Sequence, residues 1–511
     1  MDADAIARSL QEFLAESPAA VVVESGEVIF DFSTASFSCS TERGQCLLHL
    51  WSQERNTVRR VLDAEIKHDV LRLQAQRFGQ SRPVLMEICR NRDRRTPTAK
   101  RAARIAYQRL LQRMLERHFA GFSSRRMTTA ADLERSFSPI YTRGELCRGN
   151  SSWAVLGLNG QEAQGAIDGS VTFGLLWLDA CRSRSRGHVE GLKLFLPAGR
   201  SAIARERMAL LNHQAARFEL YEVDESEGSI EPVDCRDRGN IVTRLVRCPD
   251  GSMARARFAS AIARIQELAP ESEVRVLSAS DIAFRLSGLE FARVRLTQDQ
   301  GFRNVEEIVF GAGPYQATLT EANAAEFAGF VHAVRERRRA DAPSTKPLWR
   351  MQPERWLESL VARDVSELDS RLDASCVYSQ VPAFSASDRA MIDVLTLTRE
   401  RRLAVLELKA DEDIHLPLQG LDYWARVEWH RARGEFQKFG YFPGIELAPS
   451  PPLLLLVAPA FHVHPSTDTL LRYITPEIEC ELVGIGERWR EGIQVVFRKR
   501  RQAAFAADSR G

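Results

Sequence analysis

Three ionisable residues stand in two apolar segments near the C-terminus of the chain. Asp393 lies within 391–395, and Glu407 and Lys409 close the run 403–409. A charged group inside an apolar strand is costly unless something pairs with it. Two carboxylates together are what a hard divalent cation takes from a protein. The pattern predicts a cation site, and the functional interpretation depends on it.

The chemistry expected of this site is hydrolysis of a phosphodiester bond. Because side chains alternate along a strand, Lys409 projects to the same face as Glu407. There it can contact a phosphate or deprotonate an attacking water. Mg²⁺ or Mn²⁺, held by Asp393, Glu407 and the carbonyl of Leu408, would acidify that water and offset the charge that builds on phosphorus. Such a reaction needs no covalent nucleophile.

The elements expected around these residues form a compact α/β core. Apolar spacing predicts helices and strands in the following order: helix 353–361, strands 377–381, 390–396 and 403–409, helix 416–435, and strand 453–458. On the first helix Glu354 and Glu358 lie one turn apart. On the second, Gln419 and Tyr423 are four apart and share one face, from which they can orient the water, the lysine or a phosphate.

This pattern resembles the PD-(D/E)xK nuclease superfamily, the restriction-endonuclease-like proteins. The resemblance rests on Asp393 in Ile392-Asp393-Val394-Leu395 and on Glu407-x-Lys409 in the next strand. It is nearest to the NucS/Mrr-type and RecB-type members, and it covers about 353–460. In the motif that names the superfamily a proline stands directly before the first acid. Here Ile392, not proline, stands directly before Asp393.

The resemblance implies an αβββαβ core and a Mg²⁺-dependent (or Mn²⁺-dependent) nuclease. In relatives of this kind an acid on the first helix adds a metal contact, and Glu358 matches it best, with Glu354 second. Gln419-x-x-x-Tyr423 is similar to the helix motif of RecB-type and phage-exonuclease-type members. The implied metal ligands are Asp393, Glu407, Leu408 and Glu358, and the implied catalytic residues are Asp393, Glu407, Lys409, Gln419 and Tyr423.

Composition describes an ordinary globular protein of 511 residues with a formal net charge of +2. Its nine cysteines include no Cys-x-x-Cys pair, which argues against a disulfide framework and a zinc ribbon and favours a reducing cytoplasm. The first residues are acidic where a signal peptide would be basic, and no apolar run reaches membrane-spanning length. We expect a cytoplasmic protein without a membrane partner.

One segment is strongly basic. Twelve lysines and arginines lie between Arg90 and Arg126, against two acids, and a helix is expected over 98–119. An excess of this size suits a polyanion such as nucleic acid, although a solvated helix face is the alternative. The residues expected to contact nucleic acid are Lys100, Arg101, Arg104, Arg109 and Arg113.

A chain of this length exceeds one hydrophobic core. The expected organisation is an N-terminal mixed α/β domain with the basic helix (1–135), a middle α/β domain (136–250), a small α/β domain (251–340), a linker (341–352) and the nuclease-like domain (353–511). A long helix is expected over 56–78 and strands over 171–178 and 189–196. The order of elements in the middle domain leaves two alternatives, an ordinary α/β domain, which we favour, or a degenerate copy of the nuclease fold.

The function expected from these observations is hydrolysis of nucleic acid, DNA before RNA, in repair, restriction or defence. A non-catalytic nucleic-acid-binding or regulatory protein that keeps the nuclease fold as a scaffold is the alternative, and the intact acid-acid-lysine set argues against it. The sequence does not distinguish endonuclease from exonuclease, and it leaves both a monomer and a homodimer open.

Overall fold

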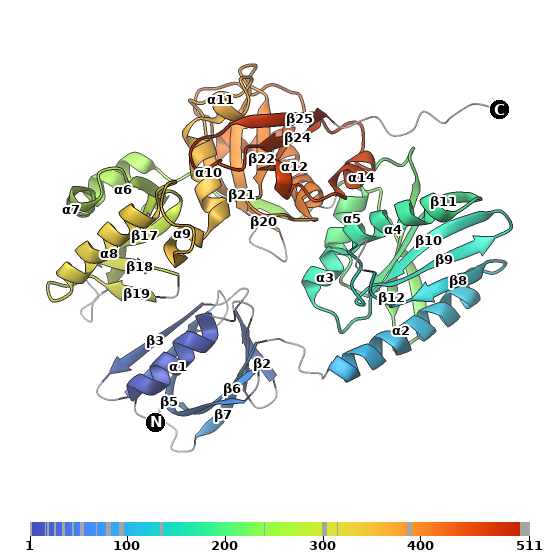
Figure 1. Cartoon of the computed structure of the whole chain (residues 1–511), viewed down its shortest axis with the longest axis horizontal. Coiled ribbons are helices and arrows are strands. Elements are labelled where there is room, and N and C mark those ends of the chain that lie inside the picture. The colour runs from blue at the N-terminus through green and yellow to red at the C-terminus, as the bar shows by residue number, and fades with distance from the viewer. Residues whose placement is uncertain are drawn as a thin grey trace. The chain divides into compact units, whose positions relative to one another are not determined.

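The computed structural model (Figure 1) describes residues 3–15, 17, 20–24, 27–32, 36–42, 45–51, 56–67, 69–77, 83–90, 97–132, 136–239, 241–298, 304–313, 315–385 and 391–500. The chain forms two compact units, one of Met1–Lys100 with Gly313–Gln316 and one of Arg101–Ala312 with Ala317–Gly511. Helices and sheets are mixed throughout, so the expected mixed α/β class is confirmed. Among the described residues, no helix has the length and apolar character needed to cross a membrane.

The first unit is an antiparallel sheet with one helix, α1 (Ala3–Ala15), packed on it. The strand order is β2-β1-β7-β6-β5-β4-β3. Leu10 and Phe13 of α1 are buried with Leu48 and Leu71 of the sheet. The strands are β1 (Val21–Glu24), β2 (Glu27–Asp31), β3 (Ser36–Glu42), β4 (Gln45–Trp51), β5 (Asn56–Lys67), β6 (Val70–Arg77) and β7 (Val84–Cys89).

The long helix predicted over 56–78 is wrong, because this segment forms the β5–β6 hairpin. The prediction rested on apolar residues four apart, such as Leu62 and Ile66, but both are exposed. A spacing of four is a multiple of two, so residues four apart share a face in a strand as well as in a helix. The informative signal was the alternation of buried Leu71 and Leu73 with exposed neighbours.

The basic helix is present as α2 (Pro97–His118), and from Arg101 on it belongs to the second unit. Its buried residues Tyr107, Leu111 and Leu115 pack against Trp153 and Val155 of the middle sheet. The boundary predicted at 135 is therefore wrong, since α2 packs with the residues that follow it and the first unit ends at Lys100.

The middle sheet has the order β13-β12-β11-β10-β9-β8, with α2 on one face and α4 on the other. The strand predicted over 171–178 is wrong, because it lies in α4. That helix is buried on almost all sides, so its sequence is a continuous apolar run without helical periodicity. The elements are β8 (Ser123–Thr128), β9 (Thr142–Arg148), β10 (Ser151–Gly157), α3 (Gln164–Asp168), α4 (Ser170–Arg184), β11 (His188–Pro197), α5 (Ala202–Met208), β12 (Arg217–Asp224) and β13 (Ser229–Val233).

The C-terminal sheet has the order β14-β20-β21-β22-β23-β24-β25. The predicted succession of helix, three strands, helix and strand is present, and β24 and β25 extend it. The elements are β14 (Thr243–Leu245), α10 (Pro353–Arg363), α11 (Val365–Leu368), β20 (Tyr378–Ser385), β21 (Met391–Leu397), β22 (Leu403–Leu408), α12 (Leu416–Ala432), α13 (Glu435–Lys438), β23 (Leu453–Pro459), α14 (Thr467–Arg472), β24 (Cys480–Ile485) and β25 (Val495–Arg500).

A smaller antiparallel sheet, with the order β15-β16-β17-β18-β19, is covered by α7 and α8. Its elements are α6 (Gly251–Arg257), α7 (Ala259–Leu268), β15 (Glu273–Ser278), β16 (Asp281–Leu286), β17 (Leu289–Gln298), β18 (Asn304–Ala312), β19 (Tyr315–Thr318) and α8 (Ala324–Arg337).

This small sheet is docked tightly on α10. Gly288 has a φ of +75°, and a Cβ atom there would lie 2.0 Å from the carbonyl oxygen of Arg355. The buried guanidinium of Arg338 lies 4.2 Å from the ring centre of Trp356 and donates to the carbonyls of Leu348 and Met351. Most of the predicted linker 341–352 is exposed, but it includes α9 (Pro347–Arg350), and Leu348 and Met351 pack against the core of the small sheet.

Candidate functional site

The β21–β22 hairpin brings the two predicted carboxylates together. In the antiparallel register Val394 pairs with Leu406, which places Asp393 and Glu407 at the next step of the ladder. The backbone N–H of Leu408 donates to Asp393 Oδ2 at 3.0 Å. The Leu408 peptide, whose carbonyl was expected to be a metal ligand, therefore lies beside Asp393.

Lys409 follows directly after β22 and is surrounded by acids. Its Nζ lies 3.4 Å from Glu407 Oε1, and 3.7 Å from both Glu354 Oε1 and Asp413 Oδ2. The lysine side chain is only 13% exposed. The three residues of the predicted acid-acid-lysine set thus form one cluster, as strand alternation requires.

Burial dominates the electrostatics of this cluster. It raises the pKa of Asp393 to about 6, against an opposing hydrogen bond from the Leu408 N–H, and the charge of Glu358 adds to the rise. Burial, and next the charge of Asp393, raise the pKa of Glu407 well above its ordinary value. For Lys409 burial lowers the pKa of the amine, but the neighbouring carboxylates, Glu407 first, outweigh it and raise that pKa.

The two helix acids of α10 have different surroundings. Glu358 is buried, and its Oε2 accepts from Arg355 at 3.0 Å and from Gln380 Nε2 at 2.6 Å. Arg275 of the small sheet lies 3.7 Å from Glu358 Oε1. Gln380 Nε2 also donates to Asp393 at 3.3 Å, so one amide connects Glu358 with Asp393. Glu358 is therefore neutralised by arginines.

Glu354, in contrast, is half exposed and faces Lys409. Sequence reasoning ranked it second among the helix acids, yet it is the one whose carboxylate reaches the lysine. Gln380 and Arg275 were not anticipated. Their contacts join segments far apart in the chain, and nothing local marks them. The contact of Arg355 with Glu358 at i,i+3 could have been anticipated from helix spacing.

The predicted pair on α12 lies near the carboxylates. Burial, and then the charges of Glu407 and Asp393, raise the pKa of Tyr423. Gln419 Oε1 is buried and, among the described residues, has no hydrogen-bond partner. Both observations agree with a polar site between α12 and the hairpin, which the sequence predicted from the spacing of these two residues.

The donor set fits a hard divalent cation bound by few protein ligands. Glu407 Oε2 is buried and lacks a hydrogen-bond partner among the described residues, and the pKa values of Asp393 and Glu407 are raised first by burial and then by neighbouring negative charge, which a cation would neutralise. Within the described ranges, no group of three or more histidine, cysteine and acidic side chains is close enough to hold a metal. Mg²⁺ takes one or two carboxylates and keeps several waters, so Asp393 and Glu407 suffice for it.

The basic residues of α2 lie in another part of the second unit, on the middle sheet. Arg101, Arg109 and Arg113 are exposed, and Lys100 is partly buried. Arg104 is engaged in an ion pair, with its Nε 2.7 Å from Glu162 Oε1. Of the residues expected to contact nucleic acid, the three exposed arginines are therefore the best placed to do so.

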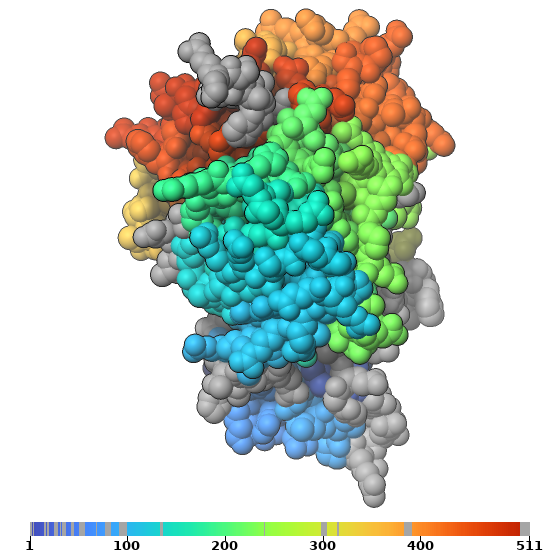
Figure 2. Space-filling view, turned by 90° about the vertical axis from the view of Figure 1, so that its right-hand side faces the viewer, coloured from blue at the N-terminus to red at the C-terminus, as the bar shows by residue number. Residues whose placement is uncertain are grey.

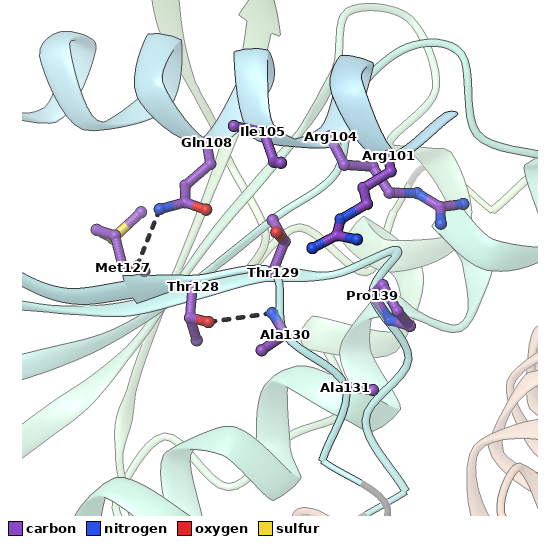
Figure 3. Close-up of a pocket in the computed structure, with 10 residues that line it drawn as sticks. All are labelled: Arg101, Arg104, Ile105, Gln108, Met127, Thr128, Thr129, Ala130, Ala131 and Pro139. Carbon is purple, nitrogen blue, oxygen red and sulfur yellow. Dashed lines mark hydrogen bonds between the residues drawn. The ribbon is translucent and has the colours of Figure 1, made fainter. Parts of the chain in front are cut away.

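A cavity of about 650 Å³ lies between α2 and the segment after β8, away from the acidic cluster (Figure 3). Figure 3 shows Arg101 extending over Thr129, while Gln108 donates to the carbonyl of Met127 at 2.9 Å. Among the described residues that line the cavity, none carries a carboxylate. The cavity is separate from the acidic cluster at the hairpin.

A pair of substitutions separates the roles of the two helix acids. We expect Glu354→Gln to lower metal-dependent turnover by about tenfold, with an unchanged melting temperature, because Glu354 is half exposed and faces Lys409. We expect Glu358→Gln to destabilise the protein by about 3 kcal/mol, because it leaves buried positive charge uncompensated. Thermal denaturation and cleavage rates check both. The reverse pattern would assign the chemical role to Glu358.

Neither models of known protein families nor the curated proteins include a match to this chain.

Proposed function

We propose that the protein is a metal-dependent nuclease that hydrolyses phosphodiester bonds of nucleic acid, with DNA favoured over RNA. The observation that carries the proposal is the convergence of Asp393, Glu407 and Lys409 on one hairpin, with Glu407 buried, Asp393 half-buried and the Lys409 amine 3.4 Å from Glu407. Burial of that kind serves stability poorly, so a functional reason for it is expected. The order of elements around the hairpin agrees with the restriction-endonuclease-like αβββαβ core.

Each residue has a distinct task in this proposal. Asp393 and Glu407 would hold Mg²⁺ or Mn²⁺, which when bound acidifies a water and stabilises charge on the phosphate. Lys409 holds the attacking water or the scissile phosphate, with Glu354 orienting its amine. Gln380 keeps Asp393 in place through its contact with Glu358. Gln419 and Tyr423 bound the site from α12.

Cleavage assays on supercoiled plasmid, linear duplex, single-stranded DNA and RNA, each with and without Mg²⁺ or Mn²⁺, test this proposal. We expect metal-dependent cleavage by the wild-type protein and a loss of about 10²-fold or more in Lys409→Met, since the amine acts on the reacting groups. Lys438→Met, at an exposed lysine of α13, is the matched control and should cleave as wild type does. Equal activity in all three proteins, or none in any, would remove the proposal.

A further inference from the structure

The middle sheet and the C-terminal sheet are built in the same way. In both, successive strands pair antiparallel, antiparallel, parallel, parallel and antiparallel, over β8–β13 and over β20–β25. In both, a main helix precedes the first strand, a main helix lies between the third and fourth strands, and a short helix lies between the fourth and fifth. These helices are α2, α4 and α5 in the first sheet and α10, α12 and α14 in the second; the short helices α3, α11 and α13 accompany the main ones.

Local details agree with this correspondence between the elements of the two sheets. Pro197 ends β11, and Pro459 ends β23. Gly174 of α4 allows Leu192 to approach, since a Cβ there would lie 2.7 Å from the Leu192 side chain. Gly420 of α12 lies in the same way against β23, where a Cβ would lie 3.3 Å from the side chain of Leu454, the counterpart of Leu192, and closer still to Leu456. Two helices thus cross equivalent strands at a glycine.

The two copies pack on each other reciprocally. Helix α4 contacts α14, and its counterpart α12 contacts α5, the counterpart of α14. Arg207 of α5 binds Asp422 of α12 at 2.8 Å, and Arg472 of α14 binds Asp179 of α4 at 3.2 Å. Exchange of this kind is the property of an isologous interface around a two-fold axis.

The backbone marks the axis itself. Leu211 and Ile474, each just after the short helix of its copy, form an antiparallel bridge. The N–H of Asn212 donates to the carbonyl of Tyr473 at 2.7 Å, and the N–H of Thr475 donates to the carbonyl of Leu210 at 2.9 Å. A single buried core runs through both copies. The pair therefore has the organisation of a dimer within one chain.

Only the second copy has the ionisable set. With Pro197 set against Pro459, Leu194 corresponds to Leu456, and their ladder partners show that Leu156 stands in the position of Glu407. One strand further, Arg143 pairs with Leu156 as Asp393 pairs with Glu407. Two residues on, Leu158 replaces Lys409. Around the matched glycines, Phe173 and Trp177 replace Gln419 and Tyr423.

The first copy has no ligands for a metal ion at these positions. Leu156 and Leu158 are fully buried. The guanidinium of Arg143 lies 4.5 Å from the ring centre of Phe137 and 5.6 Å from that of Trp177, and it donates to the carbonyl of Ala130 at 2.6 Å. A buried cation and aromatic packing thus fill the space where the second copy has two acids.

The first helix of each copy also differs in charge: α10 is acidic at the site, whereas α2 is basic. Where α10 carries Glu354 and Glu358, α2 carries six lysines and arginines and one acid. Arg109, Arg113 and Arg117 are exposed along it, at the four-residue spacing that puts them on one side. In Figure 2 the light-blue segment around residues 97–118, which contains α2, forms part of the face turned to the viewer. A row of cations at this spacing suits the phosphates of a duplex.

We propose that residues 97–233 are a second copy of the fold formed by 353–500, joined to it in one chain. This copy has lost the catalytic residues. It binds duplex DNA through contacts between the arginines of α2 and the DNA phosphates. The inference rests on the proposed function. Its consequence is that one chain carries one working centre, so it breaks one strand per encounter, where a symmetric dimer would break two.

The first test measures how many DNA strands the protein cuts in one encounter. We expect the full chain to be a monomer by light scattering and to convert supercoiled plasmid to the open circle, with linear DNA only after a second, later nick. Linear product formed from the start, or a dimer in solution, would overturn the single-centre inference. If the wild-type protein cleaves nothing, the proposed function fails, and the binding test below decides the role of the first copy.

The second test measures binding without cleavage, with Asp393→Asn protein and a fluorescent 30-base-pair duplex as probe. We expect Arg109→Gln/Arg113→Gln/Arg117→Gln to weaken binding about tenfold or more and to lower the slope of log K against log salt by up to ~3. The matched control neutralises three exposed cations of the 251–350 segment, Arg264→Gln/Arg337→Gln/Lys346→Gln. Equal effects of the two triple variants would overturn the phosphate-holding role.

Discussion

Asp393→Asn is expected to abolish metal-dependent cleavage and, at the same time, to make the metal-free protein more stable near neutral pH. The carboxylate is half-buried beside Glu407 and Glu358, and removal from solvent raises its pKa to about 6, so its ionised form is disfavoured in the folded state. Asparagine keeps the acceptor for the Leu408 N–H and removes the charge. We expect a loss of about 10³-fold or more in rate and a gain of about 3 kcal/mol at pH 7.5.

The matched control is Glu400→Gln, at an exposed acid in the turn of the same hairpin. It removes one negative charge from the β21–β22 connection without touching the cluster, and it should change neither rate nor melting temperature. Rates on plasmid and thermal denaturation without metal measure the two effects. A variant that is inactive but less stable than wild type would mean that Asp393 serves the fold, and the metal-site interpretation would fail.

The hairpin could be predicted from the sequence because its signals are local. Leu403 to Leu408 is an apolar run, and a charged turn separates it from 391–397, so two adjacent antiparallel strands follow. Adjacent pairing then brings Asp393 next to Glu407 whatever the rest of the fold does. The lysine follows from alternation alone.

What surrounds the hairpin was not predictable in the same way. Gln380 reaches Asp393 and Glu358 from a backbone with φ of 53°, and Arg275 reaches Glu358 from a separate sheet. Such contacts depend on how whole sheets dock, which periodicity does not encode. For the same reason the helix acids were ranked by resemblance, whereas the docking of the small sheet on α10 sets which of them is free to face Lys409.

The correspondence between the two copies did not emerge from the sequence because one helix, α4, was predicted to be a strand. With 171–178 predicted as a strand, the order of elements no longer matched that of the C-terminal domain, and an ordinary α/β domain was the favoured interpretation. With α4 as a helix, the counterparts of Asp393, Glu407 and Lys409 are Arg143, Leu156 and Leu158. A helix buried on all sides carries no 3.6-residue period, so its sequence alone favours a strand.

Metal-induced stabilisation is expected to depend steeply on pH, and it provides a readout other than cleavage. The folded-state pKa of Asp393 is about 6, above the ordinary carboxylate value of about 4. Below pH ~4 the residue is protonated in both the folded and the unfolded chain, so it costs no stability. As pH rises through 6 the folded protein must ionise a buried group, and stability falls by about 3 kcal/mol from this residue alone.

Mn²⁺ or Mg²⁺ should offset that loss, because the ion binds the deprotonated acids and stabilises only the folded state. We therefore expect a rise in melting temperature on adding Mn²⁺ at pH 7.5, little rise at pH 5, and none at either pH in Asp393→Asn. The acids and the cation that face Asp393 are Glu407, Glu358, Glu354 and Lys409, and protonation of Glu407 acts in the same direction. A metal-induced shift in melting temperature of equal size at both pH values, or one retained in Asp393→Asn, would mean that the metal ion binds elsewhere. Asp393 and Glu407 would then not be the metal ligands proposed here.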